Sequence, residues 1–171
     1  CNLCTRGFAW GKVLGCHEGR FYNLPMAVYQ DSEYRLLYRD VDQMGVLYYS
    51  RYLELFELGR TEWVRDQGFS YRDMEDVLGL MLPVTHARCD YVSSLRFDDI
   101  AVIRTHVRAW SAVTVRYGYE IFEKSEMRLC ATGEVELGCL TKAESKPAAL
   151  PKSLIEVFEA AAPGKKGRKR N

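Results

Sequence analysis

One long helical segment, followed by a succession of alternating segments, constrains this chain more than any other feature of its sequence. From about Tyr49 to Gly68 the apolar residues recur every three or four positions, which predicts a helix of about 19 residues with one apolar face. After Gly79 apolar and polar residues alternate, as is typical of strands with one buried face. This combination predicts an α+β domain, in which an antiparallel sheet carries the helix on one face.

Five strands are expected in this sheet. The first lies at 34–38, ahead of the long helix, and the second at about 82–91. A short helix is expected from Ser70 to about Gly79, and a final amphipathic helix from Pro151 to Ala161. Three further strands, joined by hairpin turns, have their inward-facing residues within 101–109, 113–121 and 127–139.

A glycine lies within the apolar stripe of the long helix. Gly59 costs about 1 kcal/mol of helix propensity relative to alanine, so its presence there indicates close packing. We expect the sheet to cross the helix at this residue.

One helix cannot cover both faces of a five-stranded sheet. Several apolar residues remain on the wetter faces of the alternating strands, namely Ile100, Val102, Trp110 and Phe122. A second copy of the chain is the usual cover for such a surface. We therefore expect a homodimer or a homotetramer, built by joining sheet edges or sheet faces.

The charge balance argues against some classes of protein. The 24 Lys and Arg residues nearly match the 23 Asp and Glu residues, so we expect no nucleic-acid partner and no membrane partner. No apolar stretch is long enough for a membrane helix, and none near the start is flanked like a signal peptide. A cytoplasmic location is therefore expected.

The 171 residues fit one domain, with segments of a different character at both ends. We place the domain at residues 26–162, because Met26 stands just before the first patterned segment, and we treat residues 1–25 as an N-terminal extension. Residues 163–171 form a basic tail with nothing apolar to bury, so this tail is expected to be disordered.

Cysteines near the start have the ligand types of a zinc site, namely Cys1, Cys4 and Cys16 together with His17. The second half of the chain lacks the matching pair that zinc ribbons contain, so no metal is predicted. The other cysteines fall inside predicted strands, where a free cysteine behaves as a small apolar residue: Cys89, Cys130 and Cys139.

The segment from Asp40 to Tyr52 places carboxylates on a polar loop, a few residues ahead of the long helix. The first N–H groups of a helix are unpaired and carry partial positive charge, so they can polarise a carbonyl oxygen. A nearby carboxylate can then attack the carbonyl carbon or deprotonate the attacking water. The combination suits acyl transfer to water, although an Asp before a helix more often serves as a cap.

The same segment resembles a known family signature. The pattern D-x-D-x-x-G-V-x-Y-Y-x-x-Y over residues 40–52, followed by E-x-x-R-T-E-W over 57–63, is similar to hotdog-fold thioesterases of the 4-hydroxybenzoyl-CoA thioesterase type and their YbgC-like relatives. The resemblance runs from Tyr34 to Phe158 and includes Tyr91. It implies a hotdog fold, in which a five-stranded antiparallel sheet wraps around one long helix, with active sites at subunit interfaces.

The resemblance also implies site residues. Asp42 matches the catalytic carboxylate of the family, and Tyr49 matches the residue whose backbone N–H binds the thioester carbonyl. YbgC-like members often carry His at this position, whereas the hydroxybenzoyl enzyme has Tyr, so we assign only the N–H of Tyr49. The residues expected to contact the substrate lie in the same motif: Gly45, Val46 and Tyr48.

We therefore expect a thioesterase that hydrolyses acyl thioesters of CoA or of acyl carrier protein. Asp42 is expected to act as general base or as nucleophile, two roles that the sequence leaves open. Asp40 is expected to orient or cap the loop. No cofactor is expected, because a thioester is already activated. The alternative is a non-catalytic acyl-binding scaffold protein that keeps the hotdog fold.

Other residues have competing interpretations. Arg108 and Arg116 flank a predicted turn and are candidates for binding the phosphates of CoA. His86 is a second candidate for the active site, although a surface or interface role is favoured. Aromatic residues at helical spacing are usually core, but they could also line an acyl pocket: Tyr48, Tyr52, Phe56 and Trp63.

Overall fold

The structure is a computed structural model and describes residues 29–161. The predicted extension over 1–25, the basic tail and the cysteine group at Cys1, Cys4, Cys16 and His17 lie outside these residues, so these predictions are untested. Among residues 29–161 no helix has the length and apolar character needed to cross a bilayer.

In chain order the elements are β1 (Gln30–Arg35), the 3-10 helix η2 (Tyr38–Asp40), α1 (Arg51–Asp66), α2 (Tyr71–Asp76), β2 (Leu80–Met81), β3 (Val84–Tyr91), β4 (Ile100–Trp110), β5 (Thr114–Glu123), β6 (Arg128–Gly138), β7 (Leu140–Thr141) and α3 (Lys152–Ala161).

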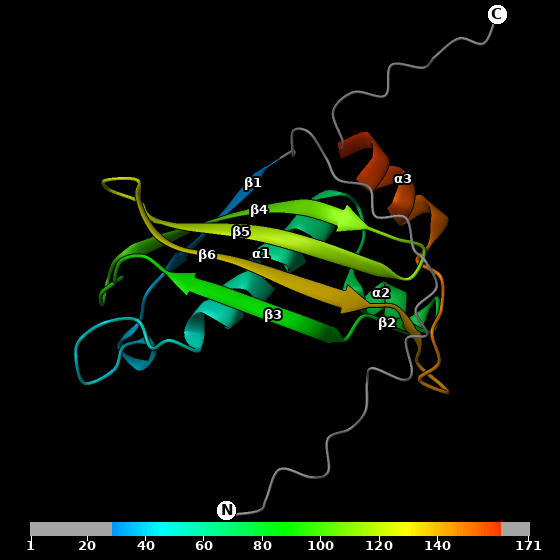
Figure 1. Cartoon of the computed structure of the whole chain (residues 1–171), viewed down its shortest axis with the longest axis horizontal. Helices are drawn as coiled ribbons and strands as arrows, with labels where there is room; N and C mark the ends of the chain where they lie inside the picture. Colours follow the sequence, from blue (N-terminus) through cyan, green and yellow to red (C-terminus); the bar gives the residue numbers. More distant parts are fainter. Residues whose placement is uncertain (1–28, 162–171) are drawn as a thin grey trace, which may run out of the picture.

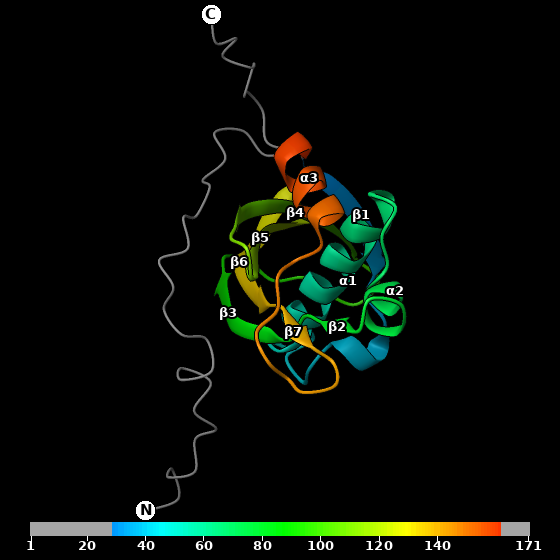
Figure 2. The same cartoon turned by 90° about the vertical axis from the view of Figure 1, so that its right-hand side faces the viewer.

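Five strands form one antiparallel sheet in the order β1-β4-β5-β6-β3, and β2 pairs with β7 separately. The sheet curls around α1, and α3 lies at one end of the molecule (Figure 1 and Figure 2). The predicted α+β architecture, a five-stranded antiparallel sheet with one long helix on one face, is confirmed. In this order β1 and β3 are the two edges of the sheet.

The helix α1 packs against the sheet through its apolar face. Phe56 stacks on Tyr119 of β5 with ring centroids 4.4 Å apart, and Trp63 meets Tyr117 edge-on at 5.9 Å. Burying a large apolar side chain of this kind stabilises a fold by about 1.5–3 kcal/mol. The buried face of α1 consists of Tyr52, Leu55, Phe56, Gly59, Trp63 and Val64. It contains most of the predicted apolar stripe, but Tyr49 and Leu53, which the spacing also places on that stripe, are exposed.

Gly59 marks the closest approach of this helix to the sheet. A Cβ atom added to Gly59 would lie 2.8 Å from Ile103 Cγ2 and would overlap Thr105 Oγ1, both on β4. The backbone of α1 therefore comes closer to β4 than a residue with a side chain permits, as predicted.

The first strand differs from its predicted position. It runs from Gln30 to Arg35, whereas the sequence predicted 34–38, and the chain turns into η2 after it. Its outer face is polar because β1 is an edge strand: Asp31 forms an ion pair with Arg104 of β4 at 2.8 Å. Polar residues on an edge give a weak strand signal in the sequence.

The prediction that Trp110 lies on the wetter face of the sheet is wrong. The register of β4 shifts at a bulge between Val107 and Ala109, so Trp110 faces the core. Its ring lies 5.8 Å from that of Phe158 on α3, and the residue is 4% exposed. Trp110 is therefore covered by α3 on the core side and does not need a second copy, and the homo-oligomer stays a prediction.

Gly59→Val is expected to lower the free energy of unfolding by about 1–3 kcal/mol, because the added side chain would force α1 away from β4. Chemical denaturation measures this change. Arg65→Ala, at an exposed position of the same helix, is the control and is expected to stay within about 0.5 kcal/mol of the wild type. A Gly59→Val variant as stable as the wild type would contradict the close approach.

Candidate active site

The loop between η2 and α1 folds back on itself (Figure 1). Val41 pairs with Leu47 across it, and the N–H of Asp42 donates to the C=O of Val46 at 2.9 Å. The N–H of Gly45 donates to the C=O of Asp42, also at 2.9 Å, and Gly45 has a φ of 73°, a conformation that favours glycine. Gly45 thus forms the turn that holds Asp42 ahead of α1.

The carboxylate of Asp42 is half-buried and is held through one oxygen. Its Oδ1 accepts the N–H of Met44 at 2.8 Å and the N–H of Val46 at 3.5 Å. Its Oδ2 has no hydrogen bond to any other residue within 29–161. One oxygen therefore orients the group, and the other is available for chemistry.

Asp40 has a structural role in the same loop. Its side chain is buried, and its Oδ2 accepts the hydroxyl of Tyr34 at 2.9 Å and the N–H of Leu37 at 2.8 Å. The Nε atoms of Arg39 and Arg51 each lie 3.8 Å from its Oδ1. Because donors surround both oxygens, the carboxylate orients the loop and caps η2, in agreement with the expectation for Asp40.

Tyr49 lies at the end of the loop, and α1 begins at Arg51, two residues later than predicted. The N–H of Arg51 donates to the C=O of Tyr48 at 2.9 Å, which orients the peptide between Tyr48 and Tyr49. Because the C=O and N–H of a trans peptide point in opposite directions, the N–H of Tyr49 points away from Arg51. This N–H has no backbone acceptor among the described residues, while the C=O of Tyr49 accepts the hydroxyl of Tyr91 at 3.0 Å.

Asp42 and Tyr49 border one cavity of about 290 Å³. Its wall is built from the loop, the first turn of α1, the end of β3 and the residues that follow β3. We call it the tyrosine cavity, because Tyr49, Tyr52 and Tyr91 line it. Its other lining residues are Met44, Val46, Leu47, Val92, Ser93 and Ser94. Three predicted site residues therefore lie together here: Asp42, Val46 and Tyr49.

Asp42 carries the one carboxyl group of this lining, which contains no basic residue. Burial raises the pKa of Tyr52 to about 12, and burial also raises the pKa of Tyr91 above its usual value. Both hydroxyls therefore stay protonated near pH 7 and can donate hydrogen bonds. The cavity is bordered by three tyrosines and one carboxylate, and one of these tyrosines, Tyr49, has an unpaired N–H, an arrangement that suits an acyl ester.

Asp42 also borders a second, more open cavity of about 570 Å³. We call it the arginine cavity, because Arg39 and Arg51 line it. Tyr48, which we expected in the substrate site, lines this cavity, and its ring lies 4.5 Å from that of Tyr49. A hydrogen bond with Tyr49 raises the pKa of Tyr48. The remaining lining residues are Tyr38, Val41 and Gln43.

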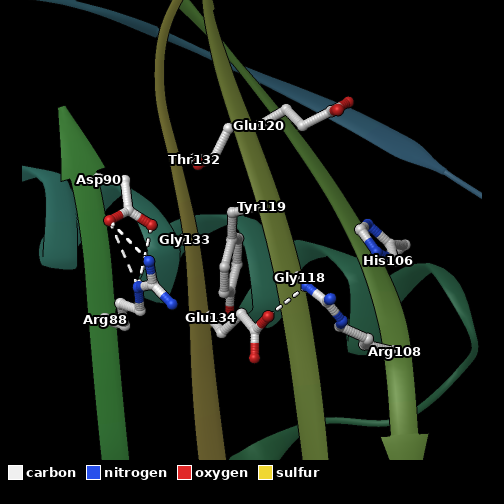
Figure 3. Close-up of a pocket in the computed structure, with 10 residues that line it drawn as sticks. All are labelled: Arg88, Asp90, His106, Arg108, Gly118, Tyr119, Glu120, Thr132, Gly133 and Glu134. Carbon is white, nitrogen blue, oxygen red and sulfur yellow. Dashed lines mark hydrogen bonds and ion pairs between the residues drawn. The ribbon is translucent and has the colours of Figure 1, made fainter. Parts of the chain in front are cut away.

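The outer face of the sheet carries a polar hollow whose lining does not include Asp42. Figure 3 shows Arg108 reaching past Gly118 to form an ion pair with Glu134. Arg116 forms an ion pair with Glu136 at 2.6 Å. Both guanidinium groups already have carboxylate partners on the outer face, so the structure does not bring them to the candidate site.

The two histidines of the sheet also lie away from Asp42. His106 lines the outer hollow with its ring over Gly118, and burial lowers the pKa of His106 (Figure 3). His86 is exposed on β3 and pairs in register with Glu136 of β6. Neither histidine lines the tyrosine cavity or the arginine cavity, so His86 is not supported as a site residue.

Four residues that line the tyrosine cavity were not predicted as site residues from the sequence. These residues come from the end of β3 and the segment after it: Tyr91, Val92, Ser93 and Ser94. Tyr91 lies 42 positions after Tyr49, so their contact depends on the path of β3 and not on local spacing. Tyr91 alone had a signal in the sequence, because it belongs to the segment that resembles the family.

Comparison with known proteins agrees with this geometry. The model of the thioesterase-like superfamily matches residues 36–158, which contain the loop, α1 and both cavities that Asp42 borders. The chain belongs to the thioesterase-like superfamily. The predicted family and the predicted enzyme class, thioester hydrolase, are confirmed.

Individual relatives cover most of the described chain. YneP of Bacillus subtilis (strain 168) is 34% identical over 116 residues, which are 67% of this chain and 82% of YneP. The acyl-CoA thioesterase YbgC of Haemophilus influenzae is 30% identical over 124 residues, 72% of this chain and 90% of YbgC. The solved DHNA-CoA thioesterase of Staphylococcus aureus is 33% identical, with a TM-score of 0.71 over 77% of this chain and 87% of that one. The predicted hotdog fold is thereby confirmed.

The two carboxylates of the loop are expected to respond differently to removal. Asp40→Ala should lower the free energy of unfolding by about 2–3 kcal/mol, because it removes a buried acceptor from Tyr34 and Leu37. Asp42→Ala should lower the free energy of unfolding by less than about 1 kcal/mol, because the hydrogen bonds of the Asp42 side chain lie on a half-exposed turn. Chemical denaturation measures both, and equal losses would contradict this division of roles.

Proposed function

We propose that this protein hydrolyses acyl-CoA thioesters in the tyrosine cavity, with Asp42 as the catalytic carboxylate. One observation carries the proposal: the unbonded Oδ2 of Asp42 and the unpaired N–H of Tyr49 belong to residues that border the same cavity. Family membership supports it, and the relative YbgC of Haemophilus influenzae is named as an acyl-CoA thioesterase.

In this mechanism the thioester carbonyl oxygen accepts the N–H of Tyr49, just ahead of the positive end of α1. The N–H stabilises the negative charge that develops on this oxygen when the carbonyl carbon becomes tetrahedral. Asp42 attacks that carbon or takes a proton from the attacking water, and both roles use its unbonded oxygen. If Asp42 activates water, collapse of the tetrahedral intermediate breaks the C–S bond, the CoA thiolate takes up a proton, and the carboxylic acid is released. If Asp42 attacks, the same collapse leaves a mixed anhydride on Asp42, which one water then hydrolyses to the carboxylic acid and free Asp42.

Asp42→Asn is expected to lower kcat/KM for acyl-CoA hydrolysis by at least about 100-fold, because the amide can neither attack the carbonyl nor accept the proton. Thiol release from a panel of acyl-CoA substrates measures the activity. Asp76→Asn, an exposed aspartate paired with Lys142, is the matched control and should keep wild-type turnover.

Two results would count against the proposal in different ways. Turnover that survives Asp42→Asn unchanged would remove Asp42 from the catalytic site. A wild-type protein that hydrolyses no acyl-CoA of the panel would instead favour a non-catalytic acyl-binding protein with the same fold.

We also propose that a second copy of the chain pairs along β3, beside the tyrosine cavity. β3 is an edge of the sheet, and its end residues Val84 and Tyr91 are 50% and 54% exposed. An exposed edge strand is a template for pairing with another strand. Because Tyr91 lines the tyrosine cavity, a copy that pairs on β3 would border the site.

Light scattering is expected to give a mass of twice the 19.7 kDa of one chain, or a multiple of that dimer. Ala87→Lys places a charge in the middle of β3 and is expected to shift the protein toward the monomer, since edge lysines oppose strand pairing. A wild-type protein that is monomeric at all concentrations would contradict the proposed dimer.

A further inference from the structure

An aromatic platform lies in the arginine cavity. The ring of Tyr38 stacks on that of Phe97, with centroids 3.7 Å apart and planes inclined by 13°. Tyr38 is nevertheless 77% exposed, so Phe97 covers one face of the ring and the other face is open. Such a supported, exposed ring is a surface on which a nucleobase can stack, because every base has a π-face.

Two guanidinium groups accompany this platform. Arg51 is held in place at the start of α1, because it donates to Glu54 and to the C=O of Arg39, while its Nε lies near Asp40. The side chain of Arg39 is 71% exposed, and its ion pair with Asp40 is long, at 3.8 Å. Arg39 can therefore turn toward an anion. Arg51 is already paired with Glu54, so an anion at Arg39 would share Arg51 with that carboxylate.

The two cavities that meet at Asp42 differ in charge. The lining of the tyrosine cavity contains no basic residue, whereas the arginine cavity contains Arg39 and Arg51. The two halves of an acyl-CoA differ in the same way, since the acyl group is uncharged and the nucleotide carries phosphates and a planar base. Arg108 and Arg116 lie on the outer face of the sheet, away from both cavities, and form short ion pairs with Glu134 and Glu136.

We propose that the arginine cavity binds the adenosine-phosphate part of CoA, with the adenine on Tyr38 and the phosphates at Arg39 and Arg51. This site rests on the proposed function, because it assumes that the thioester lies at Asp42. It makes CoA the preferred carrier, since the prosthetic arm of acyl carrier protein ends on a protein and has no adenosine.

The experiment compares the same acyl group on CoA and on pantetheine, which lacks the nucleotide. The wild type should have a kcat/KM at least about tenfold higher for the acyl-CoA, because stacking of one base contributes about that much. In Tyr38→Ala and in Arg39→Gln this ratio should fall toward one. Tyr29→Ala and Arg65→Gln, at exposed positions outside the cavity, are the matched controls and should keep the wild-type ratio.

Calorimetric titration with CoA itself tests the site without catalysis. CoA should bind Tyr38→Ala at least about fivefold more weakly than it binds the wild type. If the wild type hydrolyses neither substrate, and CoA still binds Tyr38→Ala more weakly than it binds the wild type, the proposed hydrolysis fails and the nucleotide site stands. If the wild type hydrolyses both substrates equally and CoA affinity is the same in Tyr38→Ala, the nucleotide site is overturned and the hydrolysis stands.

Discussion

The buried carboxylate of Asp40 is the interaction on which the candidate site depends. It joins β1, through the hydroxyl of Tyr34, to the start of α1, through the nearby guanidinium of Arg51. Its backbone C=O also accepts the N–H of Tyr48, so one residue fixes both ends of the loop that carries Asp42. A charge is tolerated in this place because donors surround it. Asp42, the proposed catalytic carboxylate, can therefore stand on a half-exposed turn without having to stabilise the fold.

Asp42 stands where two chemically different cavities meet. The tyrosine cavity has an aromatic wall, in which the hydroxyls of Tyr52 and Tyr91 are neutral at pH 7. The arginine cavity has two arginines and an open tyrosine ring. We expect a substrate with one uncharged end and one anionic end to bind this pair of cavities in a single orientation. Binding energy from both ends then places the bond between them at the carboxylate, which is how remote contacts assist a reaction.

The sequence predicted what depends on local periodicity and on one motif. Residue spacing predicted three features: the apolar face of α1, its close approach to the sheet at Gly59, and the alternation of β5 and β6. The family resemblance predicted Asp42 and Tyr49 as site residues. The bulge that turns Trp110 inward could not be predicted, because a one-residue shift in β4 leaves no mark on composition. The contact of Tyr91 with Tyr49 could not be predicted either, because it forms only when β3 returns to the start of α1. The arginines near the motif were not assigned for the same reason, because only the folded loop brings Arg39 and Arg51 to one cavity.

A crystal structure with an unreactive acyl-CoA analogue, in which a methylene group separates the carbonyl from the sulfur, tests the central claim most directly. We expect the carbonyl oxygen of the analogue to lie within about 3 Å of the backbone nitrogen of Tyr49. It also predicts an oxygen of Asp42 within about 3.5 Å of the carbonyl carbon, directly or through one water. An analogue bound in the hollow on the outer face, or bound with Asp42 turned away from its carbonyl, would contradict the account.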